Sequence, residues 1–374
     1  MTTTRLDGVV LDYDTTTSES MSKLLLLNIA RAHQSLPMHF TAVSNIVATY
    51  RFAFSGGIGP AATGDLGWLP VPQVGGGTEE NPTVSIAPMQ GDEFTQRLLT
   101  PFQEQKLTLL LRQGYDVDAL LRLLGAEVRI EHGPPEFIGV HRNRPSDKEG
   151  YALWRRVVSH LSSIQDRHHL SVEPLHFQHQ WVLPAESVTP ESFETTLKEF
   201  SLTFDPAKRV YTVTKRVNGR VMISNYDPAE LTDAERRTLH AEAEEVPFND
   251  VLIDIRAGRP GGELPLHGRL RLRSFHEVLT FVGRSIEEEQ EVDVKPDART
   301  PNVTENPVVT LGIAVSDSAP GDVGFSVRLN GRYYAVKPEA GYPWNLKAFA
   351  LLSQLFEMSV ANVVHTGPAI TIAK

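Results

Sequence analysis

Residues 44–64 read SNIVATYRFAFSGGIGPAATG, and the first half of this stretch alternates between two kinds of residue. One side of an extended chain would carry the apolar residues Ile46, Ala48, Tyr50, Phe52 and Phe54. The other side would carry Val47, Thr49, Arg51 and Ala53. A period of two with β-branched and aromatic residues predicts a β-strand over 46–54.

The glycines after this strand raise the question of a nucleotide site. Gly57-Ile58-Gly59 has the spacing that begins a dinucleotide-binding turn, which must lead directly into a helix. Here Pro60 follows at once, and residues 65–77, DLGWLPVPQVGGG, lack the pattern of a helix. The acidic residue that such a motif places at the end of a second strand, about 20 residues on, is also missing. We therefore interpret the glycines as a hairpin tip and expect no cofactor.

Residues 55–82 are rich in Gly and Pro, and a strand-like segment, TVSIAP, resumes at Thr83. We predict a hairpin whose two strands are joined by a long loop over 55–82. A loop of that length inside a folded domain is usually functional or mobile. We expect the strand and the loop to form an interaction surface with these candidate residues: Tyr50, Phe52, Phe54, Gly57, Gly59 and Trp68.

The rest of the chain mixes helical and strand patterns without regular alternation. Helices are predicted over 19–33 and 147–164, over three short segments between 92 and 125, and over 232–245, 274–290 and 345–359. Strands are predicted over 126–133 and 170–184, and Asn-Gly pairs at 218–219 and 330–331 predict two further hairpin turns. This mixture predicts an α+β fold and not a doubly wound sheet.

A chain of 374 residues exceeds the usual size of one core. The polar, Pro- and Gly-containing segment GPPEFIGVHRNRPSDKEG, residues 133–150, is the best candidate for a boundary. We therefore expect an N-terminal α+β domain over 1–145 and a C-terminal α+β domain over 146–374.

Charge and cysteine content exclude several classes of site. The formal net charge is −10, which disfavours binding to nucleic acid. There is no cysteine, so disulfides, zinc–thiolate centres, iron–sulfur clusters and thiol nucleophiles are all excluded. A lack of cysteine also suits an oxidising compartment. The N-terminus, MTTTRLDG, shows no pattern of a signal peptide, and the longest apolar run is too short to span a bilayer.

The sequence offers one cluster of histidines and no catalytic motif. His160, His168, His169, His176 and His179 lie close together, but no H-E-x-x-H or similar ligand set occurs. On a strand, His176 and His179 would face opposite sides, so we interpret them as sheet residues and not as metal ligands. G-x-S-x-G, P-loop and kinase signatures are absent, although paired carboxylates of a glycosidase cannot be recognised by spacing. We expect a non-enzymatic protein with no catalytic, cofactor-binding or metal-binding residues.

Three stretches resemble an uncharacterised family of bacterial envelope proteins that are usually described as lipoproteins. They are residues 13–46, YDTTTSESMSKLLLLNIARAHQSLPMHFTAVSNI, residues 82–102, PTVSIAPMQGDEFTQRLLTPF, and the C-terminal part from SFHEVLTFVGRSI at 274 through RYYAVKPEAGYPWNLKAFALLSQLFEMSVAN at 332–362. The resemblance implies a signal peptide and a lipid-modified cysteine upstream of this sequence. It also implies a place on the periplasmic side of the envelope, tethered to the outer membrane.

Three hypotheses for function follow. The first is a membrane-tethered envelope scaffold or assembly partner that binds another envelope protein or itself. The second is an oligomeric pore or export component that uses the amphipathic hairpin over 46–88, since about nine to eleven residues of tilted strand suffice to cross a bilayer. The third is a hydrolase acting on an envelope polymer, for which a deep cleft with two convergent carboxylates would be the sign.

Overall fold

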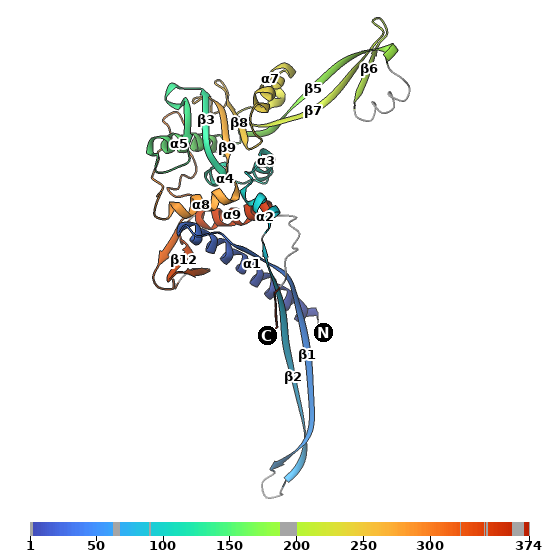
Figure 1. Cartoon of the computed structure of the whole chain (residues 1–374), viewed down its shortest axis with the longest axis vertical. Coiled ribbons are helices and arrows are strands. Elements are labelled where there is room, and N and C mark those ends of the chain that lie inside the picture. Colours follow the sequence, from blue (N-terminus) through green and yellow to red (C-terminus); the bar gives the residue numbers. More distant parts are fainter. Residues whose placement is uncertain are drawn as a thin grey trace.

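The computed structural model describes residues 3–62, 68–89, 91–187, 200–321, 323–339, 341, 343–360 and 370–373. Figure 1 shows a body of helices and sheet from which two β-structures project. A long hairpin extends from one end of the body, and a shorter arm extends sideways from the other end. Helices and mostly antiparallel strands follow one another without regular βαβ alternation, which confirms the predicted α+β class.

The main sheet of the body has the strand order β4-β3-β9-β8-β7-β5, with β6 paired to the outer part of β7. Its strands are β3 (Gly125–His132), β4 (Gly139–Arg142), β5 (Ser171–Pro184), β6 (Ser201–Asp205), β7 (Val210–Ser224), β8 (Asp250–Ile255) and β9 (Leu266–Leu272). All neighbours are antiparallel except β7 and β8. The boundary expected at 145/146 lies within this sheet, because β3 and β4 precede it and β9 pairs directly with β3. The two segments therefore share one sheet.

The helices predicted after residue 90 are confirmed. They are α2 (Asp92–Leu99), α3 (Glu104–Arg112), α4 (Val117–Leu124), α5 (Lys148–Asp166), α7 (Asp233–Glu244), α8 (Phe275–Ser285) and α9 (Trp344–Val360). Capping boxes start α7 at Thr232 and α8 at Ser274, in each case with a Glu three residues later. Such local signals are readable in sequence because they join residues only three apart.

The first helix is longer than predicted. The sequence predicts a helix that begins at Glu19, whereas α1 runs over Thr3–His33. Hydroxyls in this stretch donate to carbonyls one turn back, as from Thr15 to Leu11 and from Ser20 to Thr16. A hydroxyl used in this way lies inside a helix and does not cap it, so the prediction of the N-terminus was wrong.

One continuous hydrophobic core joins α1, α2–α5, α8, α9 and the inner face of the sheet. A smaller cluster packs α7 against the sheet through Leu175, Met222, Tyr226, Leu239 and Leu252. Trp154 of α5 is fully buried, and Gly125 allows its ring to lie against the start of β3, because a Cβ there would come within 2.3 Å of the indole. Gly283 of α8 has the same role against α1, where an added Cβ would lie 2.7 Å from the backbone nitrogen of His33. Small residues therefore set the distances between the layers.

Buried arginines fasten the irregular segment between α8 and β10 to the core. Arg122 and Arg155, each 1% exposed, both donate to the side chain of Asn306 and to the carbonyl of Pro307. These charge-assisted hydrogen bonds satisfy carbonyls that no helix or strand would satisfy.

The two Asn-Gly pairs have different roles. Asn330 and Gly331 have φ values of 48° and 87° and form the predicted tight turn between β11 (Ser326–Leu329) and β12 (Arg332–Val336). These strands form a small sheet with β10 (Ile313–Ser316), in the order β10-β12-β11. The turn predicted at Asn218-Gly219 is wrong, because β7 continues through it.

A β-bulge replaces that turn. Opposite Leu175 of β5, the β7 strand has two residues, Gly219 and Arg220, in place of one. Glycine is required here for space and not for a turn, because a Cβ on Gly219 would lie 2.7 Å from the carbonyl oxygen of Leu175. The turn that reverses the chain into β7 lies instead after β6.

The projecting hairpin consists of β1 (Phe40–Ala62) and β2 (Trp68–Met89). The predicted strands over 46–54 and 83–88 are confirmed as parts of β1 and β2. The predicted loop over 55–82 is wrong, since the described residues of that stretch pair in continuous register, from Ser55↔Gly75 to Ala62↔Trp68. Turn-type composition misled the prediction, because cross-strand hydrogen bonds hold Gly-rich backbone as well as any other. Residues 63–67 lie outside the described part.

Candidate functional site

The hairpin contains all the residues predicted to form the interaction surface. Tyr50, Phe52, Phe54, Gly57 and Gly59 lie in β1, and Trp68 is the first residue of β2. Residues directly opposite each other in an antiparallel pair share one face of the ribbon. By register and alternation, Tyr50, Phe52, Phe54 and Trp68 belong to one face and the two glycines to the other.

The two faces of the hairpin differ in composition, most clearly in the half near the body. The first, which we call the apolar face, has a single charged residue, Glu80, and consists of Ile46, Ala48, Tyr50, Phe52, Phe54, Gly56, Ile58, Pro60, Ala62, Trp68, Pro70, Pro72, Val74, Gly76, Thr78, Glu80, Pro82 and Val84. The second, which we call the mixed face, consists of Asn45, Val47, Thr49, Arg51, Ala53, Ser55, Gly57, Gly59, Ala61, Leu69, Val71, Gln73, Gly75, Gly77, Glu79, Asn81, Thr83 and Ser85. The contrast is strongest near the body, because in the outer half the mixed face has only Ser55 and Gln73 as polar side chains.

The long edges of the hairpin are largely free of partners. Among the described residues, only β13 (Ile370–Ala373) pairs with the hairpin, and it covers β2 over Thr83–Ile86. Pro60, Pro70, Pro72 and Pro82 all lie on the apolar face, at positions whose backbone nitrogen faces outward, since proline cannot donate within the ladder. The longest run of edge donors on β2 is therefore the stretch between Pro72 and Pro82.

The root of the hairpin is anchored firmly in the body. Phe40 and Met89, which are register partners, are both buried, and the ring of Phe40 stacks on Phe356 of α9 with centroids 4.9 Å apart. Asn28 of α1 is fully buried and binds the backbone of His39 through both ends of its amide, at 2.8 Å each. Helix α1 thus fixes the point where the hairpin leaves the body.

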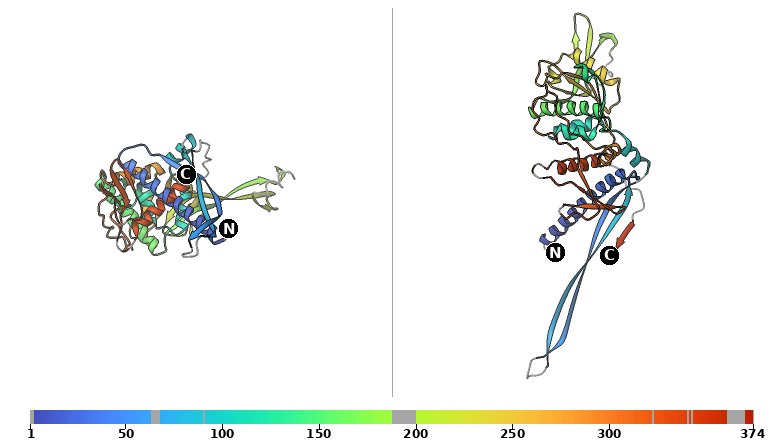
Figure 2. Two further views of the ribbon diagram at one scale, coloured as in Figure 1. Left: turned by 90° about the horizontal axis from the view of Figure 1, so that it is seen from below. Right: turned by 90° about the vertical axis from the view of Figure 1, so that its left-hand side faces the viewer.

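The second projection, which we call the arm, is formed by the outer parts of β5 and β7 together with β6. In Figure 2, the view from below shows it extending sideways from the body. It exposes a group of large apolar residues: Trp181, Val182, Leu183 and Phe204. Some of these side chains pack against neighbouring rings. The ring centroids of His179 and Trp181 lie 4.5 Å apart, and those of Phe204 and Tyr211 lie 4.8 Å apart.

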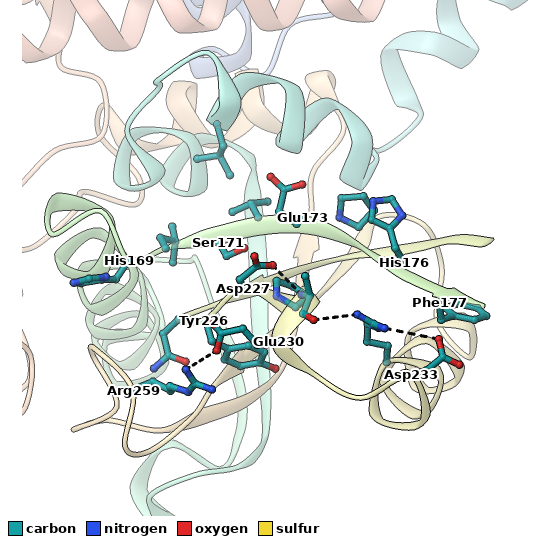
Figure 3. A pocket seen from close by; sticks show the side chains of 18 of the residues that line it. His169, Ser171, Glu173, His176, Phe177, Tyr226, Asp227, Glu230, Asp233 and Arg259 are labelled. Atoms are coloured by element: carbon teal, nitrogen blue, oxygen red, sulfur yellow. Dashed lines mark hydrogen bonds and ion pairs between the residues drawn. The ribbon is translucent and has the colours of Figure 1, made fainter. Parts of the chain in front are cut away.

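An open pocket of about 1250 Å³ lies where the arm joins the body, as Figure 3 shows. β5 lines it with residues of both faces, and the opposite wall comes from η4 (Pro228–Glu230), α7 and Arg259. Because β5 is the edge strand here, the pocket follows the strand edge. Pro174 and the hydrogen bond from the Gln178 amide to Asp233 leave that edge poorly suited to pairing with a further strand.

The carboxylates of the pocket are all engaged within the fold. Glu173 pairs with Arg112, and Glu230 pairs with Arg259 at 2.7 Å. Asp227 accepts from the Ala229 amide as the cap of η4, and Asp233 holds the Gln178 amide and Arg237. The pocket therefore places four carboxylates near one another but binds each to a group of the protein. Sequence patterns did not indicate this pocket, because its walls come from segments far apart in the chain.

Three of the five clustered histidines, His168, His169 and His176, line this pocket, and His160 and His179 are not part of its lining. His160 is buried in α5, where it contacts the Gly261 carbonyl at 2.8 Å and Thr300 at 3.1 Å, and burial lowers its pKa. His168 and His169 follow the end of α5, and only His176 and His179 lie on a strand, as predicted. The described residues contain no group of three or more His, Asp or Glu side chains placed to hold a metal ion.

A second polar cluster, not foreseen from the sequence, lies between α7 and the sheet. His267 of β9 contacts Asp254 at 3.0 Å through Nδ1 and Glu242 at 2.8 Å through Nε2. The hydrogen bond to Asp254, together with the charge of Glu242, raises the pKa of His267 to about 9. Tyr226 and Arg256 also donate to Asp254, which holds the pKa of this carboxyl below its usual value. The cluster is an ion network with a protonated imidazole at its centre.

None of the described helices is both long enough and apolar enough to span a membrane. Comparisons of this chain with protein-family models, with curated proteins and with solved structures gave no match.

Proposed function

We propose that this protein is an envelope scaffold that self-associates through the β1/β2 hairpin. The observation that carries the proposal is the hairpin itself, with strands of 23 and 22 residues that project away from the body. An isolated two-stranded ribbon is marginally stable in water, and unpaired strand edges are templates for pairing with another chain. A second copy offers the same edges, so hairpins of neighbouring copies pairing side by side would stabilise each other.

An envelope location fits the direction of α1. The helix runs from the body toward the side on which the hairpin projects, and Figure 1 places its N-terminal end beside the hairpin. A lipid-modified residue upstream of Thr3, as the family resemblance implies, would therefore hold the hairpin close to the membrane that carries the lipid. We propose the periplasmic face of the outer membrane as that place.

The mass of the protein in solution tests self-association. We expect light scattering during size exclusion to give a mass several times 41.5 kDa in mild detergent. Phe52→Asp should shift the protein toward the monomer, because it places a charge on the apolar face. Val182→Asp, an equivalent change on the exposed surface of the arm, should leave the mass unchanged. A parent protein that remains at 41.5 kDa with and without detergent would contradict the proposal.

A second candidate function is an oligomeric pore or export component. The segregation of residues between the apolar face and the mixed face supports it, because a strand that separates lipid from water needs one face of each kind. Release of a trapped dye from vesicles would test this candidate. We expect release by the parent protein and at least tenfold slower release by Phe52→Asp, and vesicles that stay intact would exclude the candidate.

A further inference from the structure

The two described strand segments of the outer hairpin contain no charged residue. Residues 52–62 of β1 and 68–78 of β2 lack Asp, Glu, Lys, Arg and His. The two stretches are register partners, because Phe52 lies opposite Thr78 and Ala62 lies opposite Trp68. Together they form a single band across the ribbon, which we call the uncharged band.

Three charged residues border the uncharged band on its body side, and from there to the root residues 40–50 and 81–89 again contain none. Arg51 lies opposite Glu79, and the next pair is Tyr50 with Glu80. A charged residue on the lipid side of a membrane strand costs about 2–4 kcal/mol at the bilayer midplane and little near the interface. A membrane surface at this level would leave Arg51, Glu79 and Glu80 at the interface and the uncharged band in the hydrocarbon.

The length of the uncharged band matches a bilayer. Each strand segment spans roughly 35 Å when extended at about 3.3 Å per residue. Tilted by about 45°, as membrane strands are, it would cover about 25 Å, which is the height of the apolar band of such proteins.

The aromatic residues of the hairpin lie toward the two ends of this band. Tyr50, Phe52 and Phe54 are at the body end of the apolar face, and Trp68 is at the tip end. Between them the apolar face contains only Gly, Ile, Pro, Ala and Val residues. Aromatic residues gather at both interfaces of a bilayer, with aliphatic residues in the hydrocarbon between them.

The prolines of the band also suit hydrocarbon. An unpaired backbone N–H in the bilayer core costs several kcal/mol. Pro60, Pro70 and Pro72 have no N–H, and they occupy positions whose nitrogen faces the outer edge of the ribbon.

We propose that the uncharged band inserts into a lipid bilayer as far as the Arg51–Glu79 pair, with its apolar face toward the lipid. The inference rests on the proposed self-association, because the remaining edge groups need the hairpins of neighbouring copies in hydrocarbon. It assigns the membrane contact to residues 52–62 and 68–78, and leaves the body and the root of the hairpin in water.

Single-cysteine labelling of the full chain tests this assignment directly, since the chain contains no cysteine of its own. Ile58→Cys and Val74→Cys report on the apolar face, Gly57→Cys and Gln73→Cys on the mixed face, and Asn81→Cys on the body side of the charged pairs. Each variant would carry an environment-sensitive fluorophore. Each would be added to vesicles of phosphatidylethanolamine and phosphatidylglycerol that contain doxyl-labelled phospholipid as quencher.

We expect quenching by lipid at positions 58 and 74 to be at least twofold stronger than at 57 and 73, and negligible at 81. Equal quenching on the two faces, or quenching that extends to position 81, would overturn the assignment. Light scattering of the same samples separates the two proposals. Oligomers whose labels all remain in water would refute membrane insertion and leave self-association standing, whereas monomers with unquenched labels would refute both.

A charge placed in the band gives an independent test. Val74→Arg puts a cation near the middle of the apolar face, and Gln73→Arg puts the same cation on the neighbouring mixed face. Sedimentation with vesicles should show at least tenfold weaker binding for Val74→Arg than for Gln73→Arg. Equal binding of the two variants would contradict the proposal.

Discussion

At the scale of single residues, Arg220 shows how a side chain inside a strand can connect distant segments. Its guanidinium group donates to Glu104 of α3 at 2.8 Å and to the carbonyl groups of Ala243, Val246, Pro247 and Asp250. All five N–H donors of the side chain are thereby used. The bulge at Gly219 turns this residue into the interior, so the Asn-Gly pair that resembled a turn serves to position an arginine.

Removal of Arg220 should destabilise the body strongly. Arg220→Met would leave the carboxylate of Glu104, 2% exposed, without its cation, which typically costs 3–5 kcal/mol. Urea unfolding should show a loss of about this size in the free energy of unfolding. Arg216→Met, at an exposed position on the same strand, should change it by less than about 0.5 kcal/mol. Equal losses of unfolding free energy in the two variants would show that the contacts of Arg220 do not stabilise the body more than those of an exposed arginine.

His267 should make the stability of the fold depend on pH. Its pKa in the folded protein is about 9, against about 6.5 when unfolded, because Asp254 and Glu242 favour the protonated ring. A raised pKa stabilises the fold fully below pH 6.5, and the contribution disappears as the pH rises through 9. Parent protein and His267→Gln should therefore differ most in free energy of unfolding at pH 6 and least at pH 9.5. A difference that grows with pH would contradict this assignment.

At the scale of elements, the hairpin depends on α1 and α9 where it leaves the body. Phe40 packs among aromatic side chains, and Asn28 pairs with the backbone of His39 much as a neighbouring strand would. Because the hairpin is long, a small rotation at its root would move its far end by a large distance. The direction of the hairpin therefore depends on these few contacts.

Loss of the Asn28 amide should loosen the root. Asn28→Ala would leave the N–H and C=O of His39 without this partner, at a cost of about 1–3 kcal/mol. Hydrogen exchange, followed by mass spectrometry, should accelerate in the peptide covering residues 38–44. Ser20→Ala, on the exposed part of the same helix, should leave that peptide unchanged. Unchanged exchange in Asn28→Ala would show that the aromatic contacts and the hydrogen bond from Arg31 to the His39 carbonyl suffice to hold the root.

At the scale of the whole molecule, the body and the hairpin are structurally distinct parts. The hydrophobic core joins α1, the helices and the sheet, and the hairpin contributes to it through Phe40 and Met89 at its root. The rest of the hairpin projects beyond the body, as Figure 1 and the right-hand view of Figure 2 show. Stability of the body and assembly of copies should therefore be separable.

Shortening the hairpin tests that separation. Replacement of residues 44–85 by Asn-Gly would join Val43 to Ile86, which are register partners, through a two-residue turn. We expect the midpoint of thermal unfolding to change by only a few degrees, because the buried root is retained, while the protein becomes monomeric. A shortened protein that still forms the oligomer of the parent would move the assembly surface to the body or the arm.

The sequence by itself determined those features that depend on neighbours in the chain. Helices with capping boxes at Thr232 and Ser274, the tight turn at Asn330-Gly331 and the alternating strand at 46–54 are all written locally. The alternating pattern also located the candidate surface residues on a strand. Their role in an interaction surface stays a prediction.

Only the tertiary structure decided how far the strands run, how the sheet is ordered and which groups meet. Strand pairing joins Ser55 to Gly75 and β3 to β9, so Gly-rich segments became strands, and one sheet crosses the boundary expected at 145/146. The bulge at Gly219, the pocket beside β5 and the His267 cluster likewise need partners from distant segments. Local propensity is worth less than about 1 kcal/mol per residue, and long-range hydrogen bonds and burial outweigh it wherever the two disagree.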